Sequence, residues 1–366
     1  MIRLLLLVLL LLPQIACHRA GLRANIQESG LVACVQPGAL DAKGKVLTCE
    51  TSAVTIIGDR VLIANDKQVA PPAAQVFSLP LATLHGEVAF ETIRPELHEW
   101  VTQVRKIEDI TRSEAHDLTL ISTAFDRTPE TGGPDGARFN NLLAIWGHAV
   151  EHADVVAPNQ SGDIVSSIVL RERFLRALAS PEFPAGPSYF KIEGLAVIPP
   201  NNVLFGVRET GPDFEHPRYG MTVLHGRFSE DEHGAVVLSE RFQRLDLTLP
   251  DGAASDLGLS AMAYDHKRKG TWIVGSIEGA EGEPMRSQLF FLPDKRWREG
   301  RLDSVLAHRG ARQFDLPYKL EGITMLDDHT LLGVCDEDRT LSQVVINNQA
   351  RRRDLHQGVF VRILVK

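Results

Sequence analysis

The sequence predicts an all-β fold for residues 22–366, a β-propeller of five or six four-stranded antiparallel blades in a single domain. Three observations support this prediction. Pairs of short apolar runs recur along the chain, and a polar turn joins the two runs of each pair. These turns are rich in Gly, Pro, Asn and Asp, the residues that β-hairpin turns require. Helical periodicity is confined to residues 169–179, which we expect to form a helix over one face.

Five copies of this unit follow one another. The first runs begin at Ser52, Glu108, Glu193, Ser260 and Glu321. The second runs lie at 61–66, 118–123, 203–208, 271–276 and 331–336. A third run follows at 75–79, 141–146, 221–228, 288–292 and 358–364, and some copies show a fourth, such as 241–247. A four-stranded unit repeated in this way is typical of a propeller blade.

The two ends of the chain decide how such a ring closes. The last copy has no clear outer strand before Lys366, and residues 22–36 are the segment that could supply it. A sixth, degenerate blade remains open, in residues 22–50 or in the long third unit. Five copies in order favour a propeller over the alternative, an irregular β-sandwich.

Residues 1–16 have the features of a secretory signal peptide: Arg3 precedes an apolar run at 4–12, and Ala16 stands before Cys17. The run is shorter than the roughly 20 residues of a membrane-spanning helix. Ala16-Cys17 resembles the bacterial lipobox, in which the cysteine becomes the lipidated first mature residue. We therefore expect an exported lipoprotein of the periplasm or outer membrane; the alternative is ordinary cleavage and a soluble periplasmic protein.

The remaining cysteines fit an oxidising compartment. Cys34 and Cys49 lie on either side of turn signals and could form a disulfide, which would leave Cys335 as a buried free thiol. The net charge of −8 argues against nucleic acid and against an anionic membrane surface as partners, so any membrane contact runs through the lipid alone. We expect a monomer.

Propeller geometry selects the candidate site. The start of each inner strand and the end of the strand that returns beside it meet at one rim, near the central channel. The residues at these positions include Asp66, Glu108, Glu193, Arg208, Glu321 and Asp336, with Lys67, Asp126 and Glu278 beside them. The sequence therefore predicts a rim rich in carboxylates.

Clustered carboxylates repel one another unless they share protons or bind a cation. Calcium, which takes six to eight oxygen ligands in flexible geometry, suits such a rim. We expect Asp66, Glu108, Glu193, Glu321 and Asp336 to be the metal ligands. Glu193, Arg208 and Glu321 are the expected catalytic residues, with Arg208 as a clamp on an anionic group.

A structural interpretation of the same residues stays open. Glu108, Glu193 and Glu321 could instead bind backbone amides of the next blade and hold the ring together, and Arg208 could pair with a rim glutamate. His148 and His152 are four residues apart, but a solvated loop explains them better than a metal site does.

Three motifs resemble a family of exported bacterial propellers of unknown function. They are Cys-Glu-Thr-Ser-Ala-Val at 49–54 with Ala-Asn-Asp at 64–66, Ile-Glu-Gly-Leu-Ala at 192–196 with Gly-Val-Arg at 206–208, and Leu-Glu-Gly-Ile-Thr at 320–324. The Glu-Gly-aliphatic strand start is also similar to that of esterase-like phytase domains, which implies calcium-dependent hydrolysis of phosphate or carboxylic esters. Ser52 and Ser260 stand where that pattern places acids.

Two functions follow from these observations. The first is a calcium-dependent hydrolase of a small phosphate ester, ester or lactone at the central-channel face. The second is a non-catalytic protein of the cell envelope that recognises a protein or a glycan. Propellers support both, so the fold does not choose between them.

Overall fold

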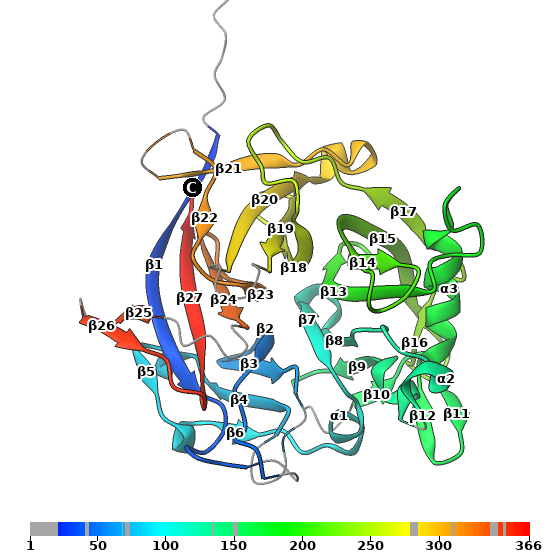
Figure 1. Cartoon of the computed structure of the whole chain (residues 1–366), viewed down its shortest axis with the longest axis horizontal. Helices are drawn as coiled ribbons and strands as arrows, with labels where there is room; N and C mark the ends of the chain where they lie inside the picture. The colour runs from blue at the N-terminus through cyan, green and yellow to red at the C-terminus, as the bar shows by residue number, and fades with distance from the viewer. Residues whose placement is uncertain are drawn as a thin grey trace, which may run out of the picture.

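The computed structural model describes residues 21–366 except 41–43, 68, 70–73, 134, 149–152, 279–284, 309, 311, 337–342 and 347–348. The predicted signal peptide, residues 1–16, and Cys17 lie outside this part of the chain. Within it the fold is all-β, and the sheets stand around a common centre as in a propeller (Figure 1). No helix of these residues is long and apolar enough to cross a membrane.

Two four-stranded antiparallel sheets lie within residues 51–155. The order in one is β2-β3-β4-β6, formed by β2 (Thr51–Ile57), β3 (Arg60–Asn65), β4 (Val76–Pro80) and β6 (Arg94–Pro95). The order in the other is β7-β8-β9-β10, formed by β7 (Ile107–Ser113), β8 (Leu118–Thr123), β9 (Leu142–Trp146) and β10 (Ala153–Val155). Gly58 has a φ of 60° in the β2–β3 turn, the backbone conformation that the predicted glycine turn requires.

A third antiparallel sheet has longer strands. It contains β13 (Tyr189–Ile198), β14 (Asn202–Gly211) and β15 (Arg218–Glu230), with β16 (Val236–Leu238) and β17 (Gln243–Asp246) both paired to β15. Helix α3 (Ile168–Leu178) packs on this sheet through Phe174, which contacts Phe205 and Phe242. The helix predicted at 169–179 is thus confirmed.

The largest sheet brings the two ends of the chain together. Its order is β18-β19-β20-β21-β1-β27-β24-β23, with the short β22 (Asp315–Leu316) on β20 and β5 (Glu87–Val88) on β1. The remaining bounds are β18 (Gly258–Asp265), β19 (Gly270–Ile277), β20 (Arg286–Pro293), β21 (Asp303–Ala307), β1 (Leu22–Ala33), β27 (Gln357–Val365), β24 (Thr330–Cys335) and β23 (Leu320–Asp327). Strand β1 runs antiparallel to β27 and parallel to β21. Residues 22–36 therefore supply the missing strand beside the last run.

Smaller elements decorate this frame. They are the hairpins β11 (Asn159–Ser161)–β12 (Ile164–Ser166) and β25 (Gln343–Ile346)–β26 (Gln349–Arg352), the short helices α1 (Glu99–Gln103) and α2 (Pro129–Gly132), and the 3-10 helices η1 (Leu81–Thr83), η2 (Phe90–Thr92), η3 (Glu114–His116), η4 (Gly136–Phe139) and η6 (Asp294–Glu299).

The inner strands contact one another in a closed circuit. Strand β2 contacts β7 and β23, and β13 joins β7 to β18, which in turn contacts β23 (Figure 1). Glycine allows the closest approach: a Cβ on Gly322 would lie 2.8 Å from Cα of Ala53. This circuit gathers the starts of all five strands at one place.

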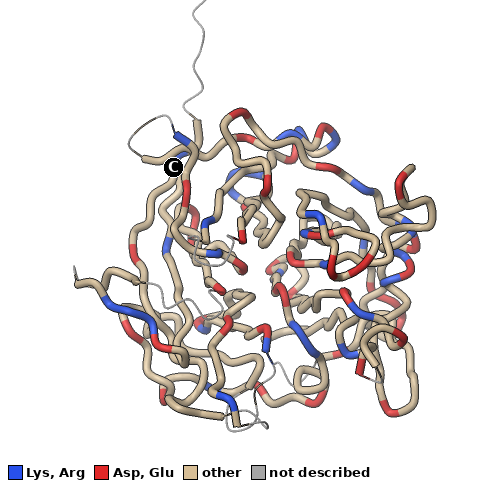
Figure 2. The backbone as a smooth tube through the Cα atoms, viewed as in Figure 1, with Lys and Arg blue, Asp and Glu red and all other residues tan. Residues whose placement is uncertain are grey.

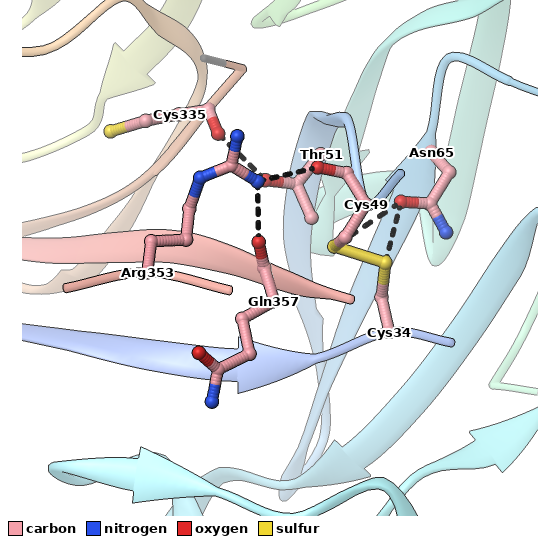
Figure 3. The surroundings of a disulfide bond; sticks show 7 residues. All are labelled: Cys34, Cys49, Thr51, Asn65, Cys335, Arg353 and Gln357. Carbon is pink, nitrogen blue, oxygen red and sulfur yellow. Dashed lines mark hydrogen bonds between the residues drawn. A yellow bond between two sulfur atoms is a disulfide. The ribbon is translucent and has the colours of Figure 1, made fainter. Parts of the chain in front are cut away.

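A disulfide joins the two ends of the segment that connects β1 to β2 (Figure 3). Cys34 follows β1 and Cys49 precedes β2, and their sulfur atoms are bonded, which confirms the predicted pair. Cys335 is buried and forms no disulfide with a described cysteine, also as expected. Arg353, only 1% exposed, donates from Nη1 to the carbonyl oxygens of Cys49 and Gln357. Arg353 thereby links the start of β27 to the segment just before β2.

Candidate functional site

The same irregularity occurs near the start of every inner strand. In each strand the register with its partner shifts across one residue: Ser52, Glu108, Glu193, Ser260 and Glu321. These are the five residues at which the sequence repeats begin. A β-bulge leaves one residue out of the ladder and re-aims its side chain. The bulges explain how neighbouring strands can present these side chains toward a shared space.

The two serines and the three glutamates use this position differently. Ser52 Oγ donates to the carbonyl oxygen of Ile107 at 2.6 Å, and Ser260 Oγ donates to that of Leu320 at 2.8 Å. Each serine therefore ties its inner strand to a neighbouring inner strand. The glutamates instead contact lysine and arginine side chains.

A lysine stands two residues before each of these glutamates. The pairs are Lys106–Glu108, Lys191–Glu193 and Lys319–Glu321. Lys191 Nζ contacts Glu193 and also lies 3.4 Å from Oε1 of Glu108, so it links β13 to β7. Figure 2 shows charges of both signs close to the centre of the ring. The carboxylates of the rim thus alternate with ammonium groups.

Arg208 lies beneath this rim. Its Nη1 donates to Glu193 Oε2 at 3.0 Å and its Nη2 to Glu278 Oε1 at 3.1 Å. The side chain is 0% exposed, and its guanidinium faces the ring of Tyr219 at 5.1 Å. Gly258 makes room for it, since a Cβ there would lie 2.8 Å from Cγ of Arg208.

Lys319 contacts three carboxylates and shares one of them, Glu278, with Arg208. Its Nζ lies 2.7 Å from Glu321 Oε1, 2.9 Å from Glu278 Oε1 and 3.8 Å from Asp336 Oδ2. At the first sheet, Lys67 pairs with Glu50 at 2.7 Å and with Asp66 at 3.2 Å. Each predicted site carboxylate therefore has a cationic neighbour.

A cavity of about 440 Å³ opens among these groups. Its lining is predominantly charged and consists of Asp66, Lys67, Arg105, Lys106, Glu108, Arg127, Phe139, Lys191, Phe214, Glu278, Lys319, Glu321 and Asp336. Four of the six predicted site residues line it. The other two, Glu193 and Arg208, are buried below and form part of its support. The structure therefore brings the predicted residues together, while their roles stay predictions.

A larger cavity, of about 820 Å³, lies elsewhere. Its lining includes Leu22 of β1, Phe291 of β20 and Leu306 of β21. None of the predicted site residues reaches it. We place the candidate site in the smaller cavity because the convergent buried charges lie there.

Burial and neighbouring charges give the carboxyl groups of the cavity different pKa values. Burial raises the pKa of Glu108 well above its ordinary value, although Lys191 opposes this. Burial also raises the pKa of Glu321, to about 8, since Asp336 and Glu193 add to it and Lys319 only partly offsets it. Burial would raise the pKa of Glu278 too, but Lys319 and Arg208 lower it to about 2. Protonated and ionised carboxyls therefore share one cavity near neutral pH.

The contacts do not fit a calcium ion shared by the five predicted ligands. Among the described residues, one group of carboxylates has ligand oxygens within 4.8 Å of one another, and it consists of Glu50, Asp66 and Asp336. Glu108, Glu193 and Glu321 are not in that group. Lys67 already neutralises Glu50 and Asp66, and an ammonium beside a divalent cation is unfavourable.

Asp109, the residue after Glu108, has the structural role that was predicted for the glutamates: it binds backbone amides of a neighbouring inner strand. Asp109, fully buried, accepts hydrogen bonds from the backbone N–H groups of Ile110 at 2.8 Å and Leu195 at 2.6 Å. Leu195 belongs to β13, so this carboxylate joins two inner strands. His148 is exposed and lies 3.6 Å from Asp117, whereas His152 and the acids at 337 and 338 fall outside the described residues.

Sequence reasoning missed several lining residues. The sequence does contain a signal for three of the lysines, the Lys-x-Glu spacing that begins at 106, 191 and 319, but these lysines lie outside the strand positions from which the site was predicted. Arg105 and Arg127 left none, because they lie outside the strand positions that the repeat rule selects. Glu50 likewise precedes its strand, and only the fold brings it to Asp66 and Asp336.

No protein-family model and no curated protein matches the chain. Solved structures do match. One is a β-1,3-galactosidase of glycoside hydrolase family 43 with galactodeoxynojirimycin, at 11% identity and a TM-score of 0.40, covering 90% of this chain and 94% of that one. The U3-55K structure has 8% identity, a TM-score of 0.39 and coverages of 91% and 98%. The Dos1 propeller has 8%, 0.29, and 79% and 67%. Likenesses at this level carry nothing about activity.

Proposed function

We propose that the rim cavity is the active site of a hydrolase that cleaves a small polar ester, with Glu321 as its general acid. The substrate classes remain those expected from the sequence: phosphate esters, carboxylic esters and lactones. One observation carries the proposal: Glu321 lines the cavity, is 3% exposed, and lies 2.7 Å from Lys319. Its raised pKa, about 8, keeps a proton on the carboxyl near neutral pH.

The chemistry needs two carboxyls in different states. A general acid is most effective when its pKa lies near the working pH, because it then carries a proton that it can release to a leaving group. Asp66 supports the complementary role: burial would raise its pKa, but Lys67, Lys106 and Lys191 lower it overall, so it stays ionised. An ionised carboxylate in the same cavity can accept a proton from water.

A second candidate function rests on the ion pairs themselves. Lys191 bridges Glu108 and Glu193, and Lys319 bridges Glu278 and Glu321, so the network stabilises contacts between neighbouring strands. A rim built only for stability suits a non-catalytic envelope protein that binds a protein or a glycan. The hydrolysis experiment below distinguishes the two.

The architecture that carries this site is proposed as five blades. Five inner strands form the circuit, and the large sheet divides into two blades if the pairing of β1 with β21 is a contact between blades. The antiparallel pairing of β1 with β27 then makes β1 the outer strand of the last blade.

Export is proposed as well, and a disulfide between Cys34 and Cys49 suits an oxidising compartment.

The test is a panel of phosphate monoesters, short acyl esters and lactones, assayed with the mature protein from about pH 5 to about pH 9. We expect at least one class to be hydrolysed, with a rate that falls as the pH rises through about 8, where Glu321 loses its proton. Glu321→Gln should abolish most of this rate. The exposed Glu299→Gln is the matched control and should behave as wild type.

Two results would count against the proposal. Equal rates for Glu321→Gln and wild type would remove Glu321 as the acid. Absence of hydrolysis across the whole panel, with and without added calcium or chelator, would favour the non-catalytic binding protein.

A further inference from the structure

One side of the rim cavity is lined by three cationic side chains. Arg105 and Lys106 come immediately before β7, and Arg127 follows β8. All three line the cavity, together with the ring of Phe139. Lys106 pairs with Asp126 at 2.5 Å and lies 3.8 Å from Glu108. Each lysine of the lining forms an ion pair with a carboxylate, whereas the two arginines form none with a described carboxylate.

Arg105 is anchored at one end of its guanidinium. Its Nη1 donates to the carbonyl oxygens of Thr102, Gln103 and Val104, at 3.2, 3.1 and 2.9 Å. In the described part of the chain, no carboxylate lies within ion-pair distance of it. The nearby Asp135 pairs with Arg138 at 3.0 Å instead. Burial and the Arg138 charge lower the pKa of Arg105, although the Asp135 charge opposes them, so a further anion beside Arg105 would be favourable.

Arg127 is positioned by stacking on an aromatic ring and not by an ion pair with a described carboxylate. Its guanidinium carbon lies 4.2 Å from the centre of the Phe139 ring. Stacking fixes the plane of the guanidinium and leaves its N–H edge for a ligand. None of the carboxylates that the structure describes forms an ion pair with Arg127. Two oriented guanidinium groups at one cavity wall match the oxygens of a phosphoryl or carboxylate group.

From this arrangement we infer that Arg105 and Arg127, with Lys106 beside them, form an oxyanion subsite that holds a phosphoryl or carboxylate group of the ligand. This inference rests on the proposed function, because it names the group by which that cavity recognises its substrate. It also moves anion binding away from Arg208, which is fully buried and already paired with Glu193 and Glu278.

Titration calorimetry with the mature protein tests the subsite, with inorganic phosphate and succinate as separate probes and glycerol as the uncharged control. We expect saturable binding of at least one anion and none of glycerol. Arg127→Gln and Arg105→Gln should each weaken that binding tenfold or more. Arg127→Lys keeps the charge but loses the planar fork, so its affinity should fall between those of Arg127→Gln and wild type.

Arg298→Gln is the matched control. Arg298 is exposed in η6 and does not line the cavity. The affinity of this variant for the anion should equal that of wild type. If Arg105→Gln fails to fold, as judged by circular dichroism, the Arg127 series decides the question alone.

The outcomes separate this inference from the proposed hydrolase. Anion binding that survives in Glu321→Gln, together with no hydrolysis of any ester, would support the subsite and refute the hydrolase. Hydrolysis that is unaffected in both arginine variants would refute the subsite and leave the hydrolase standing. Absence of saturable binding of both anions to wild type would also overturn the subsite. Tighter binding of phosphate would identify the recognised group as a phosphoryl group, and tighter binding of succinate would identify it as a carboxylate.

Discussion

Arg208 and Glu193 form an ion pair that is sealed from solvent: Nη1 lies 3.0 Å from Oε2, and the two side chains are 0% and 1% exposed. A buried pair of this kind contributes little over a well-packed apolar pair, but loss of one partner strands the other charge. The pair therefore makes the rim sensitive to substitutions that do not touch the cavity itself.

Arg208→Met should destabilise the protein by about 3–5 kcal/mol, because Glu193 would keep Lys191 but lose its guanidinium partner. The double variant Glu193→Gln/Arg208→Met should cost less than the sum of the two single variants. Urea denaturation followed by circular dichroism measures both. Arg218→Ala, which breaks an exposed pair with Glu182, is the control and should cost no more than about 1 kcal/mol. A loss that small for Arg208→Met would contradict the prediction.

Glu321 should give the folding stability a pH dependence of defined sign. The unfolded chain releases this proton near the ordinary pKa of 4.5, whereas the folded protein releases it near 8. Between these values the folded state binds more protons, so the stabilising contribution is full below about pH 4.5 and is lost as the pH rises through about 8. Glu321→Gln should therefore gain stability relative to wild type over that range. Parallel curves for the variant and wild type would show that the carboxyl titrates normally.

Reduction of the Cys34–Cys49 disulfide should lower stability by about 3 kcal/mol, the value expected for a closed loop of roughly 15 residues. Denaturation of the Cys34→Ser/Cys49→Ser variant, compared with wild type with and without reductant, measures this. The double variant should be insensitive to reductant. Alkylation of the unreduced, denatured protein should spare Cys34 and Cys49, and labelling of both would disprove the bond.

Gly322→Ala should destabilise the protein by about 1–3 kcal/mol, because the new methyl group would meet backbone atoms of Ala53 and Val54 at 2.8–2.9 Å. Neither inner strand can move without disturbing the circuit. Gly220→Ala is the control, since no atom lies within 4 Å of the added carbon there. Thermal melts of the two variants measure the difference, and similar melting temperatures would show that β2 and β23 are less closely packed.

Calcium added after chelation should leave the melting temperature unchanged, because Lys67 already neutralises Glu50 and Asp66. A specific ion at 100 times its dissociation constant would stabilise the protein by about 2.7 kcal/mol, which a melt detects easily. A saturable rise that Asp66→Asn removes would restore the calcium site predicted from the sequence.

Much of the strand framework was legible in the sequence, because hairpin turns and apolar alternation are local signals. The repeat starts at Ser52, Glu108, Glu193, Ser260 and Glu321 coincide with the five register shifts. The shifts themselves were not predicted, since a bulge depends on pairing with the next strand. The convergence of acids on one rim followed from topology alone.

The electrostatic character of the rim was harder to predict. Whether a carboxylate holds a metal or an ammonium depends on side-chain reach, and Lys191 spans from β13 to Glu108 on β7. The depth of Arg208 depends on Gly258, a residue of the next inner strand. Such contacts join residues distant in the chain, and no local pattern encodes them.

The pairing of β1 with β27 has a consequence for biosynthesis. Leu22–Ala33 is made before the other strands of the ring, yet its antiparallel partner, Gln357–Val365, is made after them. The ring can therefore close only when Gln357–Val365 has been synthesised, and the strands made earlier wait for it.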